Sequence, residues 1–507
     1  MTFGRTEASK SARFMVATYG RVSRTARSTR PRSRPIDWSL HQHRHGVRVP
    51  SVKRRRQIAK GALGPGARVR RLLWAWWLWA LTCVGLIVYD RLGWALATGV
   101  MALLSYLTTP AAAPPRYGLS HEFDVESEEF LATIAGASGA PFADGNAIEI
   151  LNNGDAFYPR MLDAIAGARV SITIEAYIYW AGAVGVEFAR ALSERAKAGV
   201  TVKILLDAIG SASIGAEILR MLDEGGCQVA WYNPIHWYTL GRFNNRTHRK
   251  SLIVDGQIAF TGGAGIADHW RGNARGPNEW RDMQIRVEGP AVVPLQAGFA
   301  HNWQQSTGEL LSGWWYYPTI DYRGPLSAQT LMSSPESGGS TVRTMYYLSI
   351  VCARKSIYIA NPYFLPDAVA IDTLIDARKR GIDVKIMVSG IRNDNWLARQ
   401  NSVRLYGRLL EAGIEIFEYN RTMLHHKTMV VDSVWVTVGT ANFDNRSFAH
   451  NEESNVCVFD RGLGRQMQEV FCADMDICER VDRETWLHRG VWARTQEFFG
   501  SFLEEQT

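Results

Sequence analysis

One pattern of reactive residues occurs twice in the chain, 177 positions apart. The two copies read His-x-Lys-x-x-x-x-Asp and consist of His248, Lys250 and Asp255, and of His425, Lys427 and Asp432. Only 12 of the 507 residues are His, which argues against a chance duplication. An imidazole can attack phosphorus or carry a proton, and an ammonium group can hold an anionic oxygen. The duplication predicts one active site, assembled from two halves, that acts on a phosphate ester without a metal or other cofactor.

The spacing within each motif separates the reactive groups from the acid. Each copy runs into an apolar, β-branched segment typical of a strand, in which side chains alternate between two faces. His and Lys, two residues apart, therefore share a face. Asp255 and Asp432 lie seven residues after their His, which turns them to the opposite face or into a turn. They belong to the candidate catalytic motif, but alternation favours a role in supporting the fold.

A reactive imidazole needs a carboxylate on its second ring nitrogen to fix its tautomer and orientation. Each half offers one acid before a further short apolar segment, Asp282 before MQIRV and Glu453 before SNVCV. We expect these two acids to orient the imidazoles. His426, between His425 and Lys427, points to the opposite face and is expected to be structural.

With these residues in view, the chain resembles the phospholipase D superfamily. The two motifs and the segments NNRTHRKSLIVDG, GTANFDNRSF and WRDMQIRVEGPAV are similar to its bacterial cardiolipin synthase branch, over about residues 145–495. The resemblance implies two similar α/β domains that share one active site. It also implies phosphatidyl transfer through a phosphohistidine, with His248 as the nucleophile and His425 as the general acid and base.

The resemblance further implies that Thr440 and Asn442, in the G-T-x-N segment, hold phosphate oxygens. The first half has Gly263 and Gly265 at the corresponding positions. Since two phosphate-holding side chains are missing there, the two halves are not expected to be equivalent.

The elements that must position these groups are duplicated as well. ARVSITIEAY, ERAKAGVTVKILL and MLDEGGCQVAWYN precede the first motif, and ARKSIYIANPY, DARKRGIDVKIMV and LLEAGIEIFEYN precede the second. Each set reads as a strand followed by two helix–strand pairs, which predicts an α/β fold with a largely parallel sheet. We expect a first domain over residues 108–325 and a second over residues 326–507.

The N-terminal part differs in composition from these domains. Residues 1–71 contain 19 Lys and Arg and two acids, a balance of +17, so the net charge of +8 leaves −9 for the rest of the chain. This Arg-, Ser- and Pro-rich tail is expected to be disordered and to bind anionic lipid headgroups. Nucleic-acid binding by the tail is the competing interpretation, and a start codon assigned too early is the third.

A long apolar segment follows the tail. Residues 72–89 and 92–107 carry no charge, and Asp90 and Arg91 separate them. A membrane span needs about 20 apolar residues, so residues 72–107 are expected to form a transmembrane segment, as a helical hairpin. The alternatives are a single tilted span and a buried helix pair. The hairpin would place the protein at the inner (plasma) membrane with its catalytic domain in the cytoplasm.

Three classes of function are compatible with these features. The first is a membrane-anchored phosphatidyltransferase similar to cardiolipin synthase, with phosphatidylglycerol as the expected phospholipid substrate. The second is a hydrolase, either a phospholipase D or a nuclease, and the third is an inactive membrane scaffold. Two intact motifs argue against the scaffold, and the acidic catalytic part argues against nucleic acid as a partner. Aromatic residues near the first motif could form a rim at the level of the lipid headgroups: Trp231, Trp237, Tyr238, Trp270 and Trp280.

Overall fold

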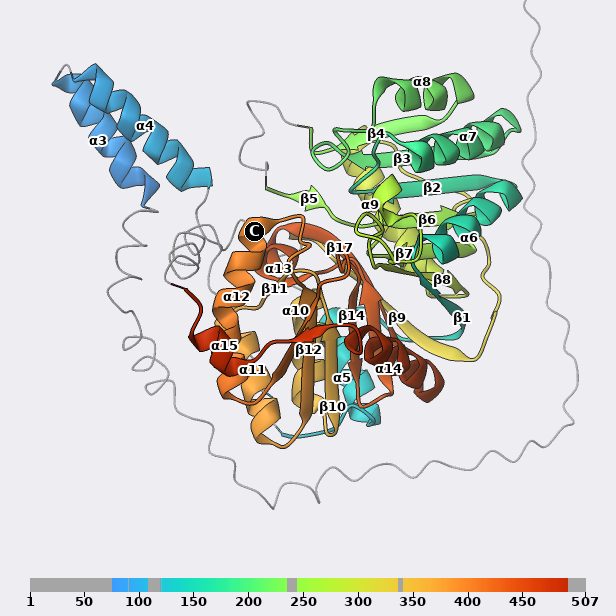
Figure 1. The fold of residues 1–507 in the computed structure, drawn as a ribbon. Coiled ribbons are helices and arrows are strands. Elements are labelled where there is room, and N and C mark those ends of the chain that lie inside the picture. Colours follow the sequence, from blue (N-terminus) through green and yellow to red (C-terminus); the bar gives the residue numbers. More distant parts are fainter. Residues whose placement is uncertain are drawn as a thin grey trace, which may run out of the picture. The chain divides into compact units, whose positions relative to one another are not determined.

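The computed structural model describes residues 75–89, 91–107, 119, 121–234, 244–335 and 341–490. Within them the protein has an α/β fold, with one sixteen-stranded sheet and one two-stranded sheet. In Figure 1 the strands of the first half run in colour from teal through green to yellow, and those of the second half from yellow through orange to red. The predicted basic tail, residues 1–71, lies outside the described residues, as do Trp237 and Tyr238.

The first half of the large sheet is built by residues 143–307. Its strands are β1 (Ala143–Asn152), β2 (Ser171–Ala176), β3 (Thr201–Asp207), β4 (Gln228–Tyr232), β5 (Arg246–Thr247), β6 (Ser251–Val254), β7 (Ile258–Gly262) and β8 (Met283–Glu288). Its helices are α6 (Gly154–Gly167), α7 (Ala183–Lys197), α8 (Ala216–Gly225) and α9 (Val292–Thr307), with a short 3-10 helix, η3 (Asp268–Trp270).

The second half repeats this order of elements. Its strands are β9 (Leu326–Ser333), β10 (Ser356–Ala360), β11 (Phe364–Leu365), β12 (Asp383–Ser389), β13 (Glu415–Tyr419), β14 (Lys427–Val431), β15 (Trp435–Gly439), β16 (Phe443–Asp444), β17 (Asn451–Phe459) and β18 (Glu479–Arg480). Its helices are α10 (Thr341–Cys352), α11 (Ala368–Lys379), α12 (Trp396–Glu411), α13 (Asn445–Ala449), α14 (Arg461–Met475) and α15 (Arg483–Leu487). The predicted duplication of elements is therefore present.

The strand order of the large sheet reflects the duplication. From one edge it runs β4-β3-β2-β6-β7-β8-β1, and from the other, after β18, it runs β13-β12-β10-β14-β15-β17-β9. β1 and β9 pair antiparallel where the halves meet. Along this order only β2-β3-β4 and β10-β12-β13, which helices connect, are parallel, and the short strand β5, which lies off this path, pairs in parallel with β17. The prediction of a largely parallel sheet is wrong, because short turns join β6 to β7 and β14 to β15, and such turns produce antiparallel pairs.

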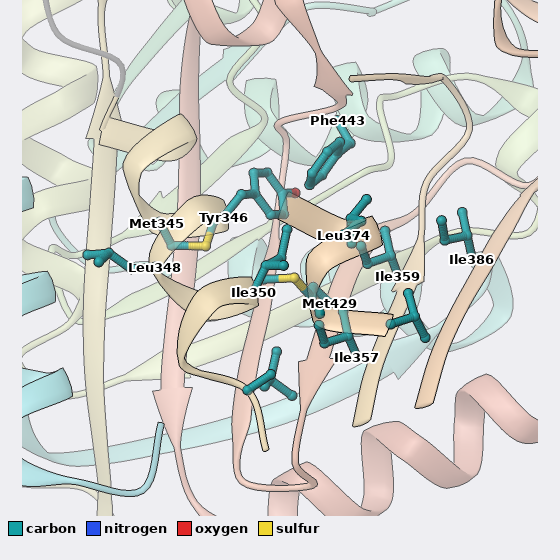
Figure 2. Packing of buried hydrophobic residues seen from close by; sticks show 14 of the residues in the cluster. Met345, Tyr346, Leu348, Ile350, Ile357, Ile359, Leu374, Ile386, Met429 and Phe443 are labelled. Carbon is teal, nitrogen blue, oxygen red and sulfur yellow. The ribbon is translucent and has the colours of Figure 1, made fainter. Parts of the chain in front are cut away.

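The core of the second half includes a helix from before the first half. Figure 2 shows residues of this core, among them Met345, Ile357 and Met429. Helix α5 (Glu128–Ser138) adds Phe130 and Ile134 to the same cluster, both with no exposed surface. Phe130 meets Trp435 edge to face, with ring centroids 5.0 Å apart. The packing thus differs from the expected domain limit at residue 108, since α5 packs with the second domain while the first begins its sheet at β1.

The apolar segment forms two helices, α3 (Trp76–Val88, 13 residues) and α4 (Leu92–Leu107, 16 residues), packed as a hairpin (Figure 1). The thiol of Cys83 donates to the carbonyl of Ala95 at 3.1 Å. Among the described residues, no helix combines the length and apolarity needed to cross a membrane. A helical hairpin is present within the described residues 76–89 and 91–107, but its assignment as a transmembrane segment is not supported. The charged pair at residues 90 and 91 divides the apolar run between two shorter helices.

Candidate active site

Each histidine motif begins where the chain runs beside the other half. β5 pairs in parallel with the first residues of β17, and the His248 N–H donates to the carbonyl of Glu452 at 2.9 Å. The second motif repeats this arrangement, because Leu424 bridges Arg281 in parallel and the His425 N–H donates to the Arg281 carbonyl at 2.7 Å. The acidic segment of each half thus lies along the motif of the other.

The side chains complete this exchange between the halves. Nδ1 of His248 lies 3.0 Å from both carboxylate oxygens of Glu453, and Nδ1 of His425 lies 2.8 Å from Oδ2 of Asp282. Both acids are fully buried, and the two histidines are 8% and 5% exposed. Each acid selected from the sequence therefore contacts an imidazole, and in both pairs the imidazole belongs to the other half. The partners are 205 and 143 residues apart in the chain.

Burial dominates the ionisation of these pairs. It lowers the pKa of His248 and of His425 to about 4, although the facing carboxylates act in the opposite direction. Burial would raise the pKa of Glu453, but the charge and hydrogen bond of His248 outweigh it and bring that pKa to about 2. At neutral pH both imidazoles are uncharged beside ionised acids. Nδ1 then carries the proton toward the acid, and Nε2 keeps its lone pair.

The two lysines belong to the same cluster of charges. Nζ of Lys250 donates to the His248 carbonyl at 2.8 Å, and Nζ of Lys427 donates to the His425 carbonyl at 2.5 Å. Nζ of Lys427 also lies 3.2 Å from Nδ1 and 3.1 Å from Nε2 of His425. Burial and the charge of Lys427 lower the pKa of Lys250 to about 7, and burial lowers the pKa of Lys427 to about 8. Since these two cations act on each other across the halves, an anion bound between them would relieve their repulsion.

Asp255 and Asp432 have the same structural task in the two halves. The carboxylate of Asp255 accepts hydrogen bonds from the backbone N–H groups of residues 169, 170 and 171, at 2.8 to 3.2 Å. That of Asp432 accepts from residues 354, 355 and 356, at 2.7 to 2.8 Å. Both acids have φ of 53°, at a turn. These bonds fasten the end of the motif strand to the start of β2 or β10, which is the supporting role that strand alternation favours.

Thr440 and Asn442 do not share one role. The hydroxyl of Thr440 donates to Oε2 of Glu453 at 2.5 Å and accepts from the Ser454 N–H at 2.9 Å. The prediction that Thr440 holds a phosphate oxygen differs from this geometry, because its hydroxyl is committed to the orienting acid. Asn442 is 6% exposed, and the oxygen of its side-chain amide is buried without a hydrogen-bond partner. Since an amide oxygen only accepts, contact of Asn442 with a phosphate oxygen would have to come from its side-chain N–H groups, and this role stays a prediction.

The aromatic residues near the first motif are distributed differently from the expected rim. Trp270 is fully buried, and its indole Nε1 donates to Oδ2 of Asp282 at 2.7 Å. Its ring centroid lies 5.5 Å from that of His425, and the Trp280 centroid lies 5.3 Å from it. The interpretation of Trp270 as a lipid-facing residue is wrong. Trp231 and Trp280 are half-buried.

A second set of charged pairs near the site residues was not predicted from the sequence. Arg249 donates to the carboxylate of Glu452, and Arg281 pairs with Asp474 at 2.8 Å, so both pairs join the two halves. His426 is 2% exposed, and its Nε2 lies 3.6 Å from Asp474, which agrees with the structural role expected for it. The sequence does contain one indication of the Arg249–Glu452 pair, because both residues are immediate neighbours of site residues.

The arrangement provides two neutral imidazoles for nucleophilic attack and proton transfer, with two cations to hold an anion. In the part of the chain that the structure describes, no group of three or more His, Cys, Asp or Glu side chains is placed to hold a metal ion.

Comparisons with known proteins agree on one family. The family model described as "Cardiolipin synthase, PLD-like domain" matches residues 161–274 and 349–475. Cardiolipin synthase 2 of Staphylococcus epidermidis is 31% identical over 382 residues, covering 75% of this chain and 78% of the relative. The major cardiolipin synthase ClsA of Bacillus subtilis is 32% identical, covering 72% and 76%. Among solved structures, phosphatidylserine synthase of Haemophilus influenzae has the same fold, with a TM-score of 0.56, 15% identity, and coverage of 74% and 96%.

Proposed function

This chain belongs to the phospholipase D superfamily, where it is a phosphatidyltransferase of the cardiolipin synthase type, and on that premise we propose that it joins two phosphatidylglycerol molecules into cardiolipin. The crossed His–acid pairs carry the proposal. Two uncharged imidazoles, each held through Nδ1, offer one group to attack phosphorus and one to move protons. A single such imidazole could not serve both tasks in one step.

We assign the nucleophile to His248 and the general acid and base to His425. In the first step, Nε2 of His248 attacks phosphorus, the bond to the headgroup oxygen breaks, and glycerol leaves with a proton from His425. In the second step, His425 takes the proton from a hydroxyl of the second phosphatidylglycerol. That oxygen then displaces His248 and forms cardiolipin. The position of Lys427 supports the choice of His248 as the nucleophile. A cation within 3.2 Å of both ring nitrogens of His425 makes His425 the poorer nucleophile.

His425 has to take up a proton from solvent when the substrate binds. The pKa of His425 is about 4 in the empty site, because burial disfavours the imidazolium. A phosphodiester anion bound between Lys250 and Lys427 would partly neutralise these cations and raise that pKa. The side-chain N–H groups of Asn442 would contribute a further contact with the phosphate group.

The reaction is tested with purified protein in phosphatidylglycerol vesicles. We expect cardiolipin and glycerol as the main products and phosphatidic acid as a minor one, since a buried site protects the phosphohistidine from water. Thin-layer chromatography or mass spectrometry of the lipids separates these products. Predominant phosphatidic acid would make the protein a hydrolase of the phospholipase D type instead.

We also propose that the protein works at the inner (plasma) membrane, with α3 and α4 inserted into the lipid and the catalytic part on the cytoplasmic side. The hairpin leaves large apolar side chains exposed, among them Val88 at 75%, Trp94 at 71% and Leu96 at 73%. Burial of such surface in lipid contributes roughly 25 cal/mol per Å². Protease added outside intact spheroplasts should leave the catalytic part uncut, and digestion there would contradict the cytoplasmic placement.

A further inference from the structure

The acid that orients His425 has a third partner besides the imidazole and the backbone. Oδ2 of Asp282, which contacts Nδ1 of His425, also accepts the indole Nε1–H of Trp270 at 2.7 Å. Oδ1 accepts the backbone N–H of Met283 at 2.7 Å. Trp270 is fully buried, and its ring lies against the imidazole that the acid holds. One side chain therefore contacts both members of the pair.

The other half performs the same task with a different residue. There the hydroxyl of Thr440 donates to Glu453, and Thr440 directly follows β15. The matching position after β7 is Gly263, where an added Cβ would lie 2.1 Å from Oδ1 of Asp282. A hydroxyl-bearing residue cannot be placed there without moving the acid. The donor has to come from elsewhere in the chain.

The second glycine of the first half accounts for the space that the indole occupies. Gly265 corresponds to Asn442, and an added Cβ would lie 3.0 Å from the ring of Trp270 and 2.8 Å from the carbonyl oxygen of Ile178. The first half has glycines where the second half has Thr440 and Asn442. The indole of Trp270 in η3 replaces both side chains, because it donates to the orienting acid and fills the space beside Gly265.

We propose that Trp270 is a positioning residue for the Asp282–His425 pair, and that its indole supplies the hydrogen bond that Thr440 supplies in the other half. The description of His425 as the acid and base rests on the proposed function, whereas the hydrogen bond does not. Unlike a hydroxyl, an indole N–H donates and cannot accept. Asp282 thus faces three N–H donors, which favour its ionised form and leave no acceptor for a proton on Oδ2.

The test replaces Trp270 by Phe and measures the pKa of His425 in the empty full-length protein, by NMR of isotopically labelled histidine. The charged groups that act on His425 are Asp282, Lys427 and Asp394. Loss of one donor concentrates negative charge on Asp282, which stabilises the imidazolium and raises the measured pKa. We expect a rise of about one pH unit, equivalent to a ~10-fold change in proton affinity, and a fall in kcat of about tenfold with little change in KM.

Two matched variants separate this effect from packing. Trp280→Phe removes the same ring atoms at a similar distance from His425, without a hydrogen bond to Asp282 in the described structure. Trp435→Phe removes another fully buried indole, whose Nε1 donates to Ser349 at 2.8 Å outside the site, and reports the structural cost of such a change. We expect the His425 pKa to rise more in Trp270→Phe than in either control. Equal shifts in Trp270→Phe and Trp280→Phe would overturn the proposal.

A measurement on the unmodified protein keeps the proposal testable even if Trp270→Phe does not fold. The indole N–H resonance of Trp270, assigned with 15N-labelled tryptophan, should move as His425 titrates and should exchange slowly with solvent. An indole N–H chemical shift that stays constant while His425 titrates would also overturn the proposal. Neither NMR readout needs substrate, so a failure to make cardiolipin would refute the proposed function without affecting these two measurements.

Discussion

At the scale of single residues, the site depends on two imidazoles that are chemically similar but differently surrounded. His248 faces Glu453 and lies 5.1 Å, centroid to centroid, from the ring of Tyr177. His425 faces Asp282 and packs beside two indoles, Trp270 and Trp280, whose ring centroids lie 5.0 Å from each other. Because each pair uses a carboxylate to hold Nδ1, both rings present Nε2 for chemistry. The surroundings, rather than the motif, distinguish their tasks.

We expect His248→Ala and His425→Ala each to abolish turnover of phosphatidylglycerol. A labelled phospholipid should attach only slowly to His425→Ala, because glycerol then leaves without a proton from His425, and it should stay attached, because no base activates the second hydroxyl. The label should not attach to His248→Ala. Denaturing gels with radiolabelled lipid provide the measurement, and appreciable turnover by either variant would refute the two-histidine mechanism.

Substitution of the orienting acid Glu453 should affect catalysis, whereas substitution of the supporting acid Asp432 should affect stability. Glu453→Gln keeps the shape of the side chain but favours the wrong tautomer of His248, so kcat should fall by ~10⁴-fold in a folded protein. Asp432→Asn loses part of a set of three backbone hydrogen bonds and should lower the free energy of unfolding by about 1–3 kcal/mol, with kcat per folded molecule nearly retained. Denaturant titration beside the kinetic assay checks both. An Asp432→Asn protein as inactive as Glu453→Gln would contradict this division.

The pH dependence follows from the pKa values of the empty site. Lysine must be protonated to bind a phosphodiester anion, so kcat/KM should fall as the pH rises above about 7, the pKa of Lys250. The nucleophile must be uncharged, so kcat/KM should also fall as the pH decreases below about 4, the pKa of His248. A profile measured with phosphatidylglycerol in mixed micelles should therefore be bell-shaped. A flat profile from pH 6 to 10 would show that Lys250 is not the titrating group.

At the scale of elements, the first residues of β17 are the structural link of the site. Glu452 and Glu453 are adjacent, so their side chains point to opposite faces of the strand, one to Arg249 and the other to His248. Both partners come from the first half. Neither half can therefore complete its own His–acid pair, and the sheet that joins the halves through β1 and β9 is required for the chemistry.

Helix α5 should stabilise the second half although it precedes the first. Phe130→Ala removes a fully buried ring that packs against Trp435, and should lower the free energy of unfolding by about 3–5 kcal/mol. Denaturant unfolding followed by far-UV circular dichroism measures the change. The matched control Leu131→Ala alters a partly buried neighbour on the same helix and should cost less. Equal losses would show that α5 does not insert Phe130 specifically into the second core.

At the scale of the whole molecule, the lipid contact proposed for the apolar hairpin can be tested separately from the chemistry of the catalytic sheet. Charged substitutions on the exposed surface of α3 and α4, such as Val88→Asp with Trp94→Asp, should reduce binding to phosphatidylglycerol vesicles by at least about tenfold. Activity toward a short-chain, water-soluble substrate should be retained. Vesicle sedimentation measures the binding, and unchanged sedimentation would place the lipid contact elsewhere in the chain.

Much of this protein could be predicted from local patterns. Alternation in the motif strands placed His and Lys on one face and assigned Asp255 and Asp432 to the fold, because side-chain direction in a strand depends only on neighbouring residues. The repeated strand–helix order identified two α/β halves for the same reason. Asp282 and Glu453 could be chosen as acids, since each opens an apolar strand.

Other features depended on contacts between distant parts of the chain, and only the tertiary structure decided them. The exchange of acids between the halves follows from the parallel pairing of β5 with β17 and of Leu424 with Arg281, which no local pattern encodes. The role of Thr440 and its replacement by Trp270 depended on which donors reach each carboxylate in space. Burial of the whole cluster set the pKa values of the imidazoles and ammonium groups, because removal from water disfavours charge whatever the motif around it.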